Sequence, residues 1–269
     1  MQWFWLIFLV MMLQPVLKKQ LQEAARQRWI ARMEKKNGSR VILLVHRQET
    51  MSFLGFPFMR FIDIHDSEEI LRAVHLTDPE IPIDLVLHTP GGLVLAATQI
   101  ASVIQSHPGK VRVYVPHFAM SGGTLIAMAA DEIIMAEHAV LGPVDPQLGD
   151  KPAASILAAV DKKEPKDIDD ATLILADQAA KARKQVEHSV YCLLEDKMEE
   201  SKARELAATL SEGHWTHDYG ISYDEAKRLG LNVNKDVPEE IFQLMVLFPQ
   251  PVRGQAGVEY LPRHRGKEA

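Results

Sequence analysis

HTPGG at residues 88–92 and AMSGGT at residues 119–124 are the two glycine-rich turns from which the fold of this chain can be worked out. A short apolar run precedes each turn and a run of small residues follows it, which predicts a strand before each turn and a helix after it. Because the carboxyl ends of neighbouring parallel strands meet at one edge of a sheet, we expect both turns to lie together there.

The two turns carry the groups that acyl transfer needs. Ser121 lies on the second turn, between a strand and a helix, where hydrolases expose a nucleophilic hydroxyl. The backbone N–H groups of Gly92 and Gly122 are unobstructed and are the expected oxyanion donors. An isolated Ser-Gly-Gly is more often a helix N-cap, but the second turn at the same edge favours a catalytic serine. The sequence therefore predicts a serine hydrolase, and a peptidase in particular.

Alternating strand and helix patterns extend outward from the turns. Strands are expected at residues 40–46, 83–88, 111–115 and 132–136, and helices at 67–76, 93–106, 124–130, 170–210 and 222–229. This order predicts an α/β fold, with a parallel sheet enclosed by helices.

The overall composition limits the classes of function. The chain has 269 residues, 47% apolar and 25% charged, which are the values of a globular protein. The net charge of −6 argues against a nucleic-acid partner, since no basic excess exists to neutralise phosphates. The single cysteine excludes an internal disulfide framework.

The N-terminal segment is different in kind. Residues 3–17 read WFWLIFLVMMLQPVL and carry no charge, which favours a membrane anchor over residues 1–17, although it is shorter than the about 20 residues of a full span. A signal peptide is disfavoured because no basic start or small-residue cleavage site is present; a buried core helix is the other alternative. Residues 18–38 are rich in Lys and Arg, which predicts a basic amphipathic helix and a single-pass protein with its catalytic domain in the cytoplasm.

Taken together, the turns, DEIIMAEHAVLGPVDPQLG at 131–149 and HDYGISYDEAKRLGL at 217–231 resemble the Clp-protease and crotonase fold. Within that fold, residues 40–233 are most similar to the serine dehydrogenase proteinase family, related to signal peptide peptidase A and the Clp proteolytic subunit. The resemblance implies a ββα-type parallel sheet, a serine endopeptidase working through an acyl-enzyme without metal or cofactor, and a homo-oligomer. It implies no redox chemistry, and no G-x-G-x-x-G motif opens a helix.

The resemblance also suggests a base for the serine. Where the Clp subunit carries its histidine, this chain has GPVDP at 142–146. The order Ser, Asp, His implied by the serine dehydrogenase proteinase family assigns Ser121, Asp145 and His217. Asp218 aligns with the orienting acid of the Clp subunit and is the alternative third member.

Three further candidates stay open. Similarity to signal peptide peptidases points to Lys197 as the base, which would require a desolvated ammonium. His138 lies between the serine and Asp145 in sequence and is a second choice. A metal site at His214, His217 and Asp218 is disfavoured because the chain has no H-E-x-x-H motif and no cysteine pair.

The expected organisation is an anchor at 1–17, a juxtamembrane helix at 18–38, a Clp/crotonase-like serine peptidase domain at 39–248 and a disordered tail at 249–269. The expected partners are a peptide or membrane-protein substrate, the membrane and further copies of the chain. Two other functions remain alternatives: a catalytically silent oligomeric membrane scaffold, and a crotonase-like acyl-thioester enzyme that would not need Ser121.

Overall fold

The computed structural model describes residues 2–47 and 60–248, and its centre is a five-stranded parallel sheet. The strand order is β1-β2-β3-β5-β10, with bounds Arg40–Val45, Ile83–His88, Val111–Val115, Glu132–Met135 and Val233–Asn234. Val45 pairs with His88, and Val86 pairs with Tyr114. Every residue of β2 is buried, Asp84 and His88 included, as expected for an inner strand of a parallel sheet that is covered on both faces. The predicted α/β fold is confirmed.

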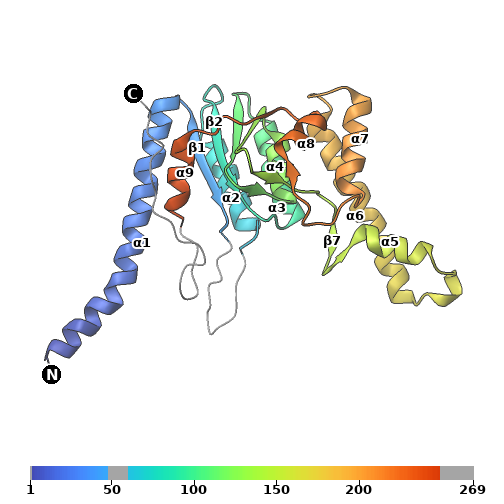
Figure 1. The fold of residues 1–269 in the computed structure, drawn as a ribbon, viewed down its shortest axis with the longest axis horizontal. Helices are drawn as coiled ribbons and strands as arrows, with labels where there is room; N and C mark the ends of the chain where they lie inside the picture. The colour runs from blue at the N-terminus through green and yellow to red at the C-terminus, as the bar shows by residue number, and fades with distance from the viewer. Residues whose placement is uncertain (1, 48–59, 249–269) are drawn as a thin grey trace.

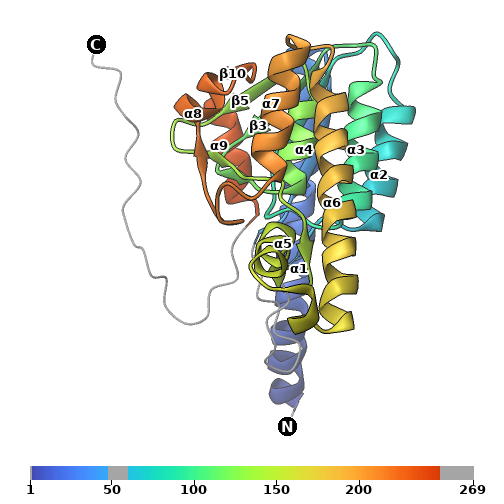
Figure 2. The same cartoon turned by 90° about the vertical axis from the view of Figure 1, so that its right-hand side faces the viewer.

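Helices cover both faces of this sheet (Figures 1 and 2). On one face lie α2 (Ile64–His75), α3 (Val94–Gln105), α4 (Gly122–Ala129), the C-terminal half of α6 (Asp170–Leu194) and α7 (Glu200–Ser211). On the other lie α1 (Gln2–Asn37) and α9 (Glu239–Val246). Alternate residues of a strand point to opposite faces of the sheet. Leu85 and Leu87 therefore belong to the hydrophobic core on the first face, while Val86 packs with Trp29 in the core on the other.

A second, smaller sheet brings distant segments to the carboxyl edge of the first. It has the order β4-β6-β9, with bounds Phe118–Ala119, Val140–Leu141 and Ile221–Ser222. β6 and β9 are antiparallel, with Leu141 opposite Ile221. The segment that follows Leu141 therefore lies beside the segment that precedes Ile221. The helix α8 (Tyr223–Arg228) then leads to β10.

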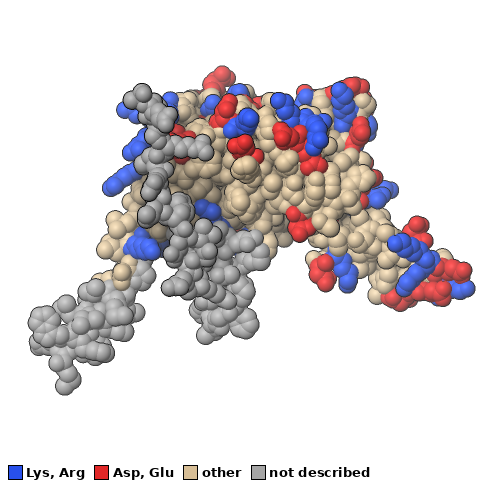
Figure 3. All heavy atoms as spheres, viewed as in Figure 1, with Lys and Arg blue, Asp and Glu red and all other residues tan. Residues whose placement is uncertain are grey.

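Residues 147–180 form an arm that projects from the body (Figure 1). It contains the hairpin β7 (Gln147–Leu148) and β8 (Lys151–Pro152), α5 (Ala153–Asp161), η1 (Pro165–Asp167) and the start of α6. The arm has a small core of its own, in which Ile156 packs with Ala176 and Ala179. Figure 3 shows acidic and basic side chains interspersed along one rim of the molecule and at the end of this arm.

Two predicted helix boundaries are wrong. The helix predicted from residue 67 begins at Ile64, because Asp63 caps it and forms a capping box with Asp66. The helical region predicted over 170–210 is interrupted between Leu194 and Glu200.

At the N-terminus, a single helix runs through both the predicted anchor and the predicted juxtamembrane helix. α1 runs without interruption over Gln2–Asn37, and its first turns project beyond the body (Figure 1). Its last turns pack on the sheet through Trp29 and Met33, and the Trp29 indole N–H donates to the carbonyl of Glu240 at 3.1 Å. Among the helices of the described residues, none is both long and apolar enough to cross a membrane, so the predicted membrane helix is not supported. The predicted tail at 249–269 lies outside the described residues.

Candidate active site

Ser121 occupies a strained backbone conformation at the start of α4. Its φ is 51° and its ψ is −118°, and it is the one residue other than glycine with positive φ in the described part of the chain. Its carbonyl accepts hydrogen bonds from the N–H groups of Thr124 and Leu125 at 2.8 and 3.3 Å. Such conformations persist where the surrounding structure holds them, and they gather at functional sites.

The two glycine-rich turns lie against each other, as the sequence predicts. Thr89 forms a parallel bridge with Ala119, and the carbonyl of Thr89 accepts from the N–H of Met120 at 3.0 Å. Gly91 comes so close to the second turn that a Cβ on it would lie 2.8 Å from the Cβ of Ser121. The position also has a φ of +104°, so only glycine fits without strain.

Replacing Gly91 with alanine should therefore cost more stability than the backbone conformation alone explains. We expect Gly91→Ala to lower the free energy of unfolding by about 3 kcal/mol, from backbone strain plus overpacking against Ser121. The matched control is Gly149→Ala, because Gly149 has a φ of +69° but open space around it. Gly149→Ala should lower the free energy of unfolding by only about 1 kcal/mol. Urea denaturation checks both values, and equal losses would contradict the close approach.

The amide N–H groups of Gly92 and Gly122 are both free of hydrogen-bond partners within the described residues. Gly122 is the first residue of α4, where an N–H has no intrahelical acceptor. The backbone of Ile62 forms a parallel bridge with Gly92, and the carbonyl of Ile62 accepts from the N–H of Leu93 at 2.9 Å. A Cβ built on Gly122 would lie 3.7 Å from the nitrogen of Gly92, so the two amides are neighbours.

His217 is anchored by a buried carboxylate. Its Nδ1 lies 2.8 Å from Oδ1 of Asp145, and Asp145 is 2% exposed. The second carboxylate oxygen accepts from Nε2 of Gln147 at 2.7 Å. Because an ionised carboxylate only accepts, the proton of a neutral His217 lies on Nδ1, and Nε2 is left as an acceptor.

A single cavity of 270 Å³ joins these groups. Ser121, Gly92, Gly122, Asp145 and His217 all line it, together with an apolar wall of Phe61, Pro90, Val94, Leu125, Val144, Pro146 and Val186. Among the hydrogen bonds of the described residues, none joins Ser121 to His217. In enzymes without substrate, such contacts are often long.

Three other sequence candidates lie elsewhere. Asp218 is exposed. The carboxylate beside the imidazole of His217 is that of Asp145, in the role for which Asp218 was the alternative. His138 is exposed in the turn between β5 and β6. His214 packs edge-on against Trp215. Of the described residues that line the cavity, none is one of these three.

Lys197 lies at the opposite end of α4 from Ser121. Its ammonium donates to the carbonyls of Met128, Ala129 and Ala130, each at 2.7 Å, and so caps the C-terminus of the helix. Burial lowers the pKa of Lys197 to about 8, against a smaller opposing effect of Asp131. Because α4 advances about 1.5 Å per residue, its two ends are roughly 12 Å apart. The structure therefore does not bring Lys197 to Ser121 within one chain, which corrects that alternative.

Sequence reasoning missed Gln147 as the second donor to Asp145. The signal available was the position of Gln147 two residues after Asp145, in a turn where Pro146 stiffens the backbone. The bond fixes the carboxylate from the side opposite to His217.

His88, which precedes the first turn, is fully buried and has no hydrogen-bond partner at either ring nitrogen within the described residues. Its ring packs on Phe118, with 4.2 Å between ring centroids. Burial, and secondarily the positive charge of Arg47, lowers the pKa of His88 to about 3.

The low pKa of His88 predicts acid-sensitive stability. Below about pH 6.5 the unfolded chain binds a proton that the fold excludes, so stability is complete above that pH and is lost as the pH falls toward 3. At pH 5 the loss amounts to about 2 kcal/mol. Urea denaturation at pH 7 and pH 5 measures it, and His88→Leu should remove this part of the difference. An equal acid-induced loss in the variant would contradict the prediction.

The α/β architecture with its parallel sheet fits a ClpP-like fold. A family model for ClpP-like SDH-type serine proteinases matches residues 1–269, and the chain belongs to this family. It is 54% identical over 259 residues to the uncharacterized protein MJ0137 of Methanocaldococcus jannaschii, covering 96% of this chain and 91% of that protein. It is 49% identical over 259 residues to MJ1495 of the same organism, covering 96% and 88%.

Among solved structures, the chain is similar to a mutant of the 1510-N membrane-bound stomatin-specific protease. The TM-score is 0.47 at 19% identity, and the match covers 76% of this chain and 82% of that one.

Proposed function

We propose that this chain is a serine endopeptidase that hydrolyses peptide bonds through an acyl-enzyme on Ser121. One observation carries the proposal: a strained serine, a histidine anchored by a buried carboxylate and two amides with no hydrogen-bond partner among the described residues line one cavity. Each group matches a role in acyl transfer, and membership of a serine proteinase family supports the reaction class.

In the proposed mechanism, Nε2 of His217 takes the hydroxyl proton as Oγ of Ser121 attacks the peptide carbonyl. The carbonyl electron pair moves to its oxygen, where the N–H groups of Gly92 and Gly122 stabilise the charge. One such donor contributes about 2.7–4 kcal/mol to lowering the barrier. The tetrahedral intermediate then collapses, and the departing amine takes the proton from His217. Water hydrolyses the resulting ester by the same steps, while Asp145 stabilises the imidazolium throughout.

The wider setting of the enzyme also remains a proposal. The apolar cavity wall suits a peptide or membrane-protein segment with an uncharged side chain next to the cleaved bond. Attachment to a membrane through residues 1–17, a cytoplasmic catalytic domain and assembly with further copies stay predictions from the sequence.

Covalent labelling of the purified full chain with a fluorophosphonate tests the proposal. We expect one adduct, mapped by mass spectrometry to Ser121, that is absent after heat denaturation and in Ser121→Ala. The matched control is Ser102→Ala, which removes an exposed serine on α3 and should label normally. Without labelling of the native chain, the proposal fails. Binding of a coenzyme A thioester would then favour the crotonase-like alternative, and its absence the silent scaffold.

A further inference from the structure

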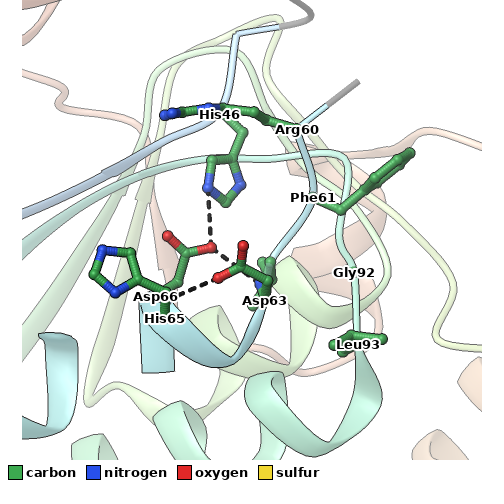
Figure 4. Close-up of a pocket in the computed structure, with 9 residues that line it drawn as sticks. His46, Arg60, Phe61, Asp63, His65, Asp66, Gly92 and Leu93 are labelled. Atoms are coloured by element: carbon green, nitrogen blue, oxygen red, sulfur yellow. Dashed lines mark hydrogen bonds and ion pairs between the residues drawn. The ribbon is translucent and has the colours of Figure 1, made fainter. Parts of the chain in front are cut away.

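Behind the first Gly-Gly turn lies a chain of three polar side chains, Thr89, His46 and Asp66, of which Figure 4 shows His46 and Asp66. His46, directly after β1, is 4% exposed, and Thr89 is fully buried. Nδ1 of His46 lies 3.0 Å from Oγ1 of Thr89, and its Nε2 lies 3.2 Å from Oδ2 of Asp66 on α2. The proposed catalytic groups include none of these three residues.

The direction of each hydrogen bond follows from the chemistry of the groups. Burial favours the protonated form of Asp66, but hydrogen bonds from His46 and from the N–H of Asp63 outweigh it and lower the pKa of Asp66. An ionised Asp66 accepts, so Nε2 of a neutral His46 carries the proton and Nδ1 accepts from the Thr89 hydroxyl. The oxygen of that hydroxyl in turn accepts from the N–H of Gly91 at 3.2 Å. The hydroxyl has a single proton, and its contact with Nδ1 of His46 at 3.0 Å is shorter than its contact with the Gly91 carbonyl at 3.4 Å.

The Thr89 hydroxyl contacts both sides of Gly91. It accepts from the Gly91 N–H, which belongs to the preceding peptide, and it lies 3.4 Å from the Gly91 carbonyl oxygen, which belongs to the peptide that presents the first oxyanion donor. The carbonyl of Gly91 and the N–H of Gly92 belong to one planar trans peptide, so holding one orients the other. That carbonyl accepts from the N–H of Ile62 at 2.7 Å, while the N–H of Gly91 is held by Thr89. Glycine has little intrinsic preference for one backbone conformation, so Gly91 and Gly92, with φ of +104° and +158°, depend on their surroundings to hold them.

We propose that Thr89, His46 and Asp66 are positioning residues that fix the Gly92 N–H toward the oxyanion. The inference rests on the proposed serine peptidase function. It assigns a task to the hydroxyl of Thr89, whose carbonyl already joins the two turns and whose methyl packs on Gly123. A misdirected donor weakens transition-state binding while substrate binding is preserved, so kcat should fall with KM little changed.

The discriminating pair is Thr89→Val against Thr89→Ser. Valine keeps the shape and the methyl contact but removes the hydroxyl, whereas serine keeps the hydroxyl. On a fluorogenic peptide, Thr89→Val is expected to lower kcat by about 10²-fold at unchanged KM, the loss typical of one oxyanion donor. Thr89→Ser should stay within about threefold, since serine can make the same bond. Native kcat in Thr89→Val, or equal losses in both variants, would overturn the inference.

Two further measurements keep the inference testable if Thr89→Val folds poorly or no hydrolysis is found. Asp66→Ala removes the partly exposed end of the chain, and kcat should fall several-fold at unchanged KM; an unchanged kcat counts against the positioning role. Side-chain ¹⁵N NMR of His46 should show the Nε2–H tautomer in Ser121→Ala, with the Nδ1 resonance shifted when Thr89→Val is added. A proton on Nδ1 of His46 instead would contradict the proposed chain of hydrogen bonds, whether or not the protein is a peptidase. Absence of hydrolysis and labelling in the native chain would refute only the proposed function.

Discussion

Ser121→Ala should lower kcat for peptide hydrolysis by about 10⁶-fold, and His217→Ala should lower it by a similar factor. Alanine at 121 removes the attacking oxygen. Alanine at 217 removes the base without which the serine hydroxyl is a weak nucleophile at neutral pH. KM should change little, because the apolar cavity wall remains in both variants. Steady-state kinetics on a fluorogenic peptide measures both losses.

The double variant Ser121→Ala, His217→Ala provides the sharper test. If the two residues act as one unit, removing the second after the first costs nothing further, and the oxyanion amides alone support the residual rate. Lys197→Met is the matched control, because this lysine caps the far end of α4 and should affect stability rather than chemistry. A further loss in the double variant, or a 10⁶-fold loss in Lys197→Met, would contradict the proposed dyad.

Local patterns in the sequence were sufficient to predict the main sheet. Apolar runs ending in turn residues marked four of its five strands, and β2 and β3 have the predicted bounds. The predicted start of α2 is wrong because Asp63 and Ser67 are both good caps in sequence, and only the structure shows which one accepts the N3 hydrogen bond. The division of the N-terminal helix at residue 17 followed a change in composition, which does not interrupt backbone hydrogen bonding.

Parts of the candidate site could likewise be predicted from the sequence, and other parts could not. The meeting of Gly91 with Ser121 follows in part from parallel strand order, because β2 and β3 are neighbours, the first turn ends β2, and the second turn follows β3 after the two-residue strand β4. The contact between Asp145 and His217 spans 72 residues and depends on β6 and β9, each of two residues. Strands that short carry no periodicity, so only the family resemblance pointed to this pair. Similarity to signal peptide peptidases pointed to Lys197, but only the structure shows that it lies in the turn after α6 and meets the C-terminal end of α4.

Asp145→Asn should lower kcat at neutral pH by about 10⁴-fold with little change in KM. The native carboxylate accepts from Nδ1 of His217 on one oxygen and from Nε2 of Gln147 on the other. An asparagine can accept on one side only. While Gln147 donates to the side-chain oxygen of the asparagine amide, the NH₂ group of that amide faces His217. It donates to Nδ1 and so forces the tautomer of His217 that carries the proton on Nε2. A histidine in that form cannot take the proton of Ser121.

The control for Asp145→Asn is Asp218→Asn, which makes the same chemical change at the exposed carboxylate next to His217. That variant should keep kcat within about threefold, because a solvated charge contributes little to the energy of the partly exposed imidazolium. Unfolding in urea must show both variants folded, since Asp145 is buried and Asp218 is not. A large loss in Asp218→Asn together with a small one in Asp145→Asn would assign the orienting role to Asp218. The hydrogen bond between Asp145 and His217 would then be structural only.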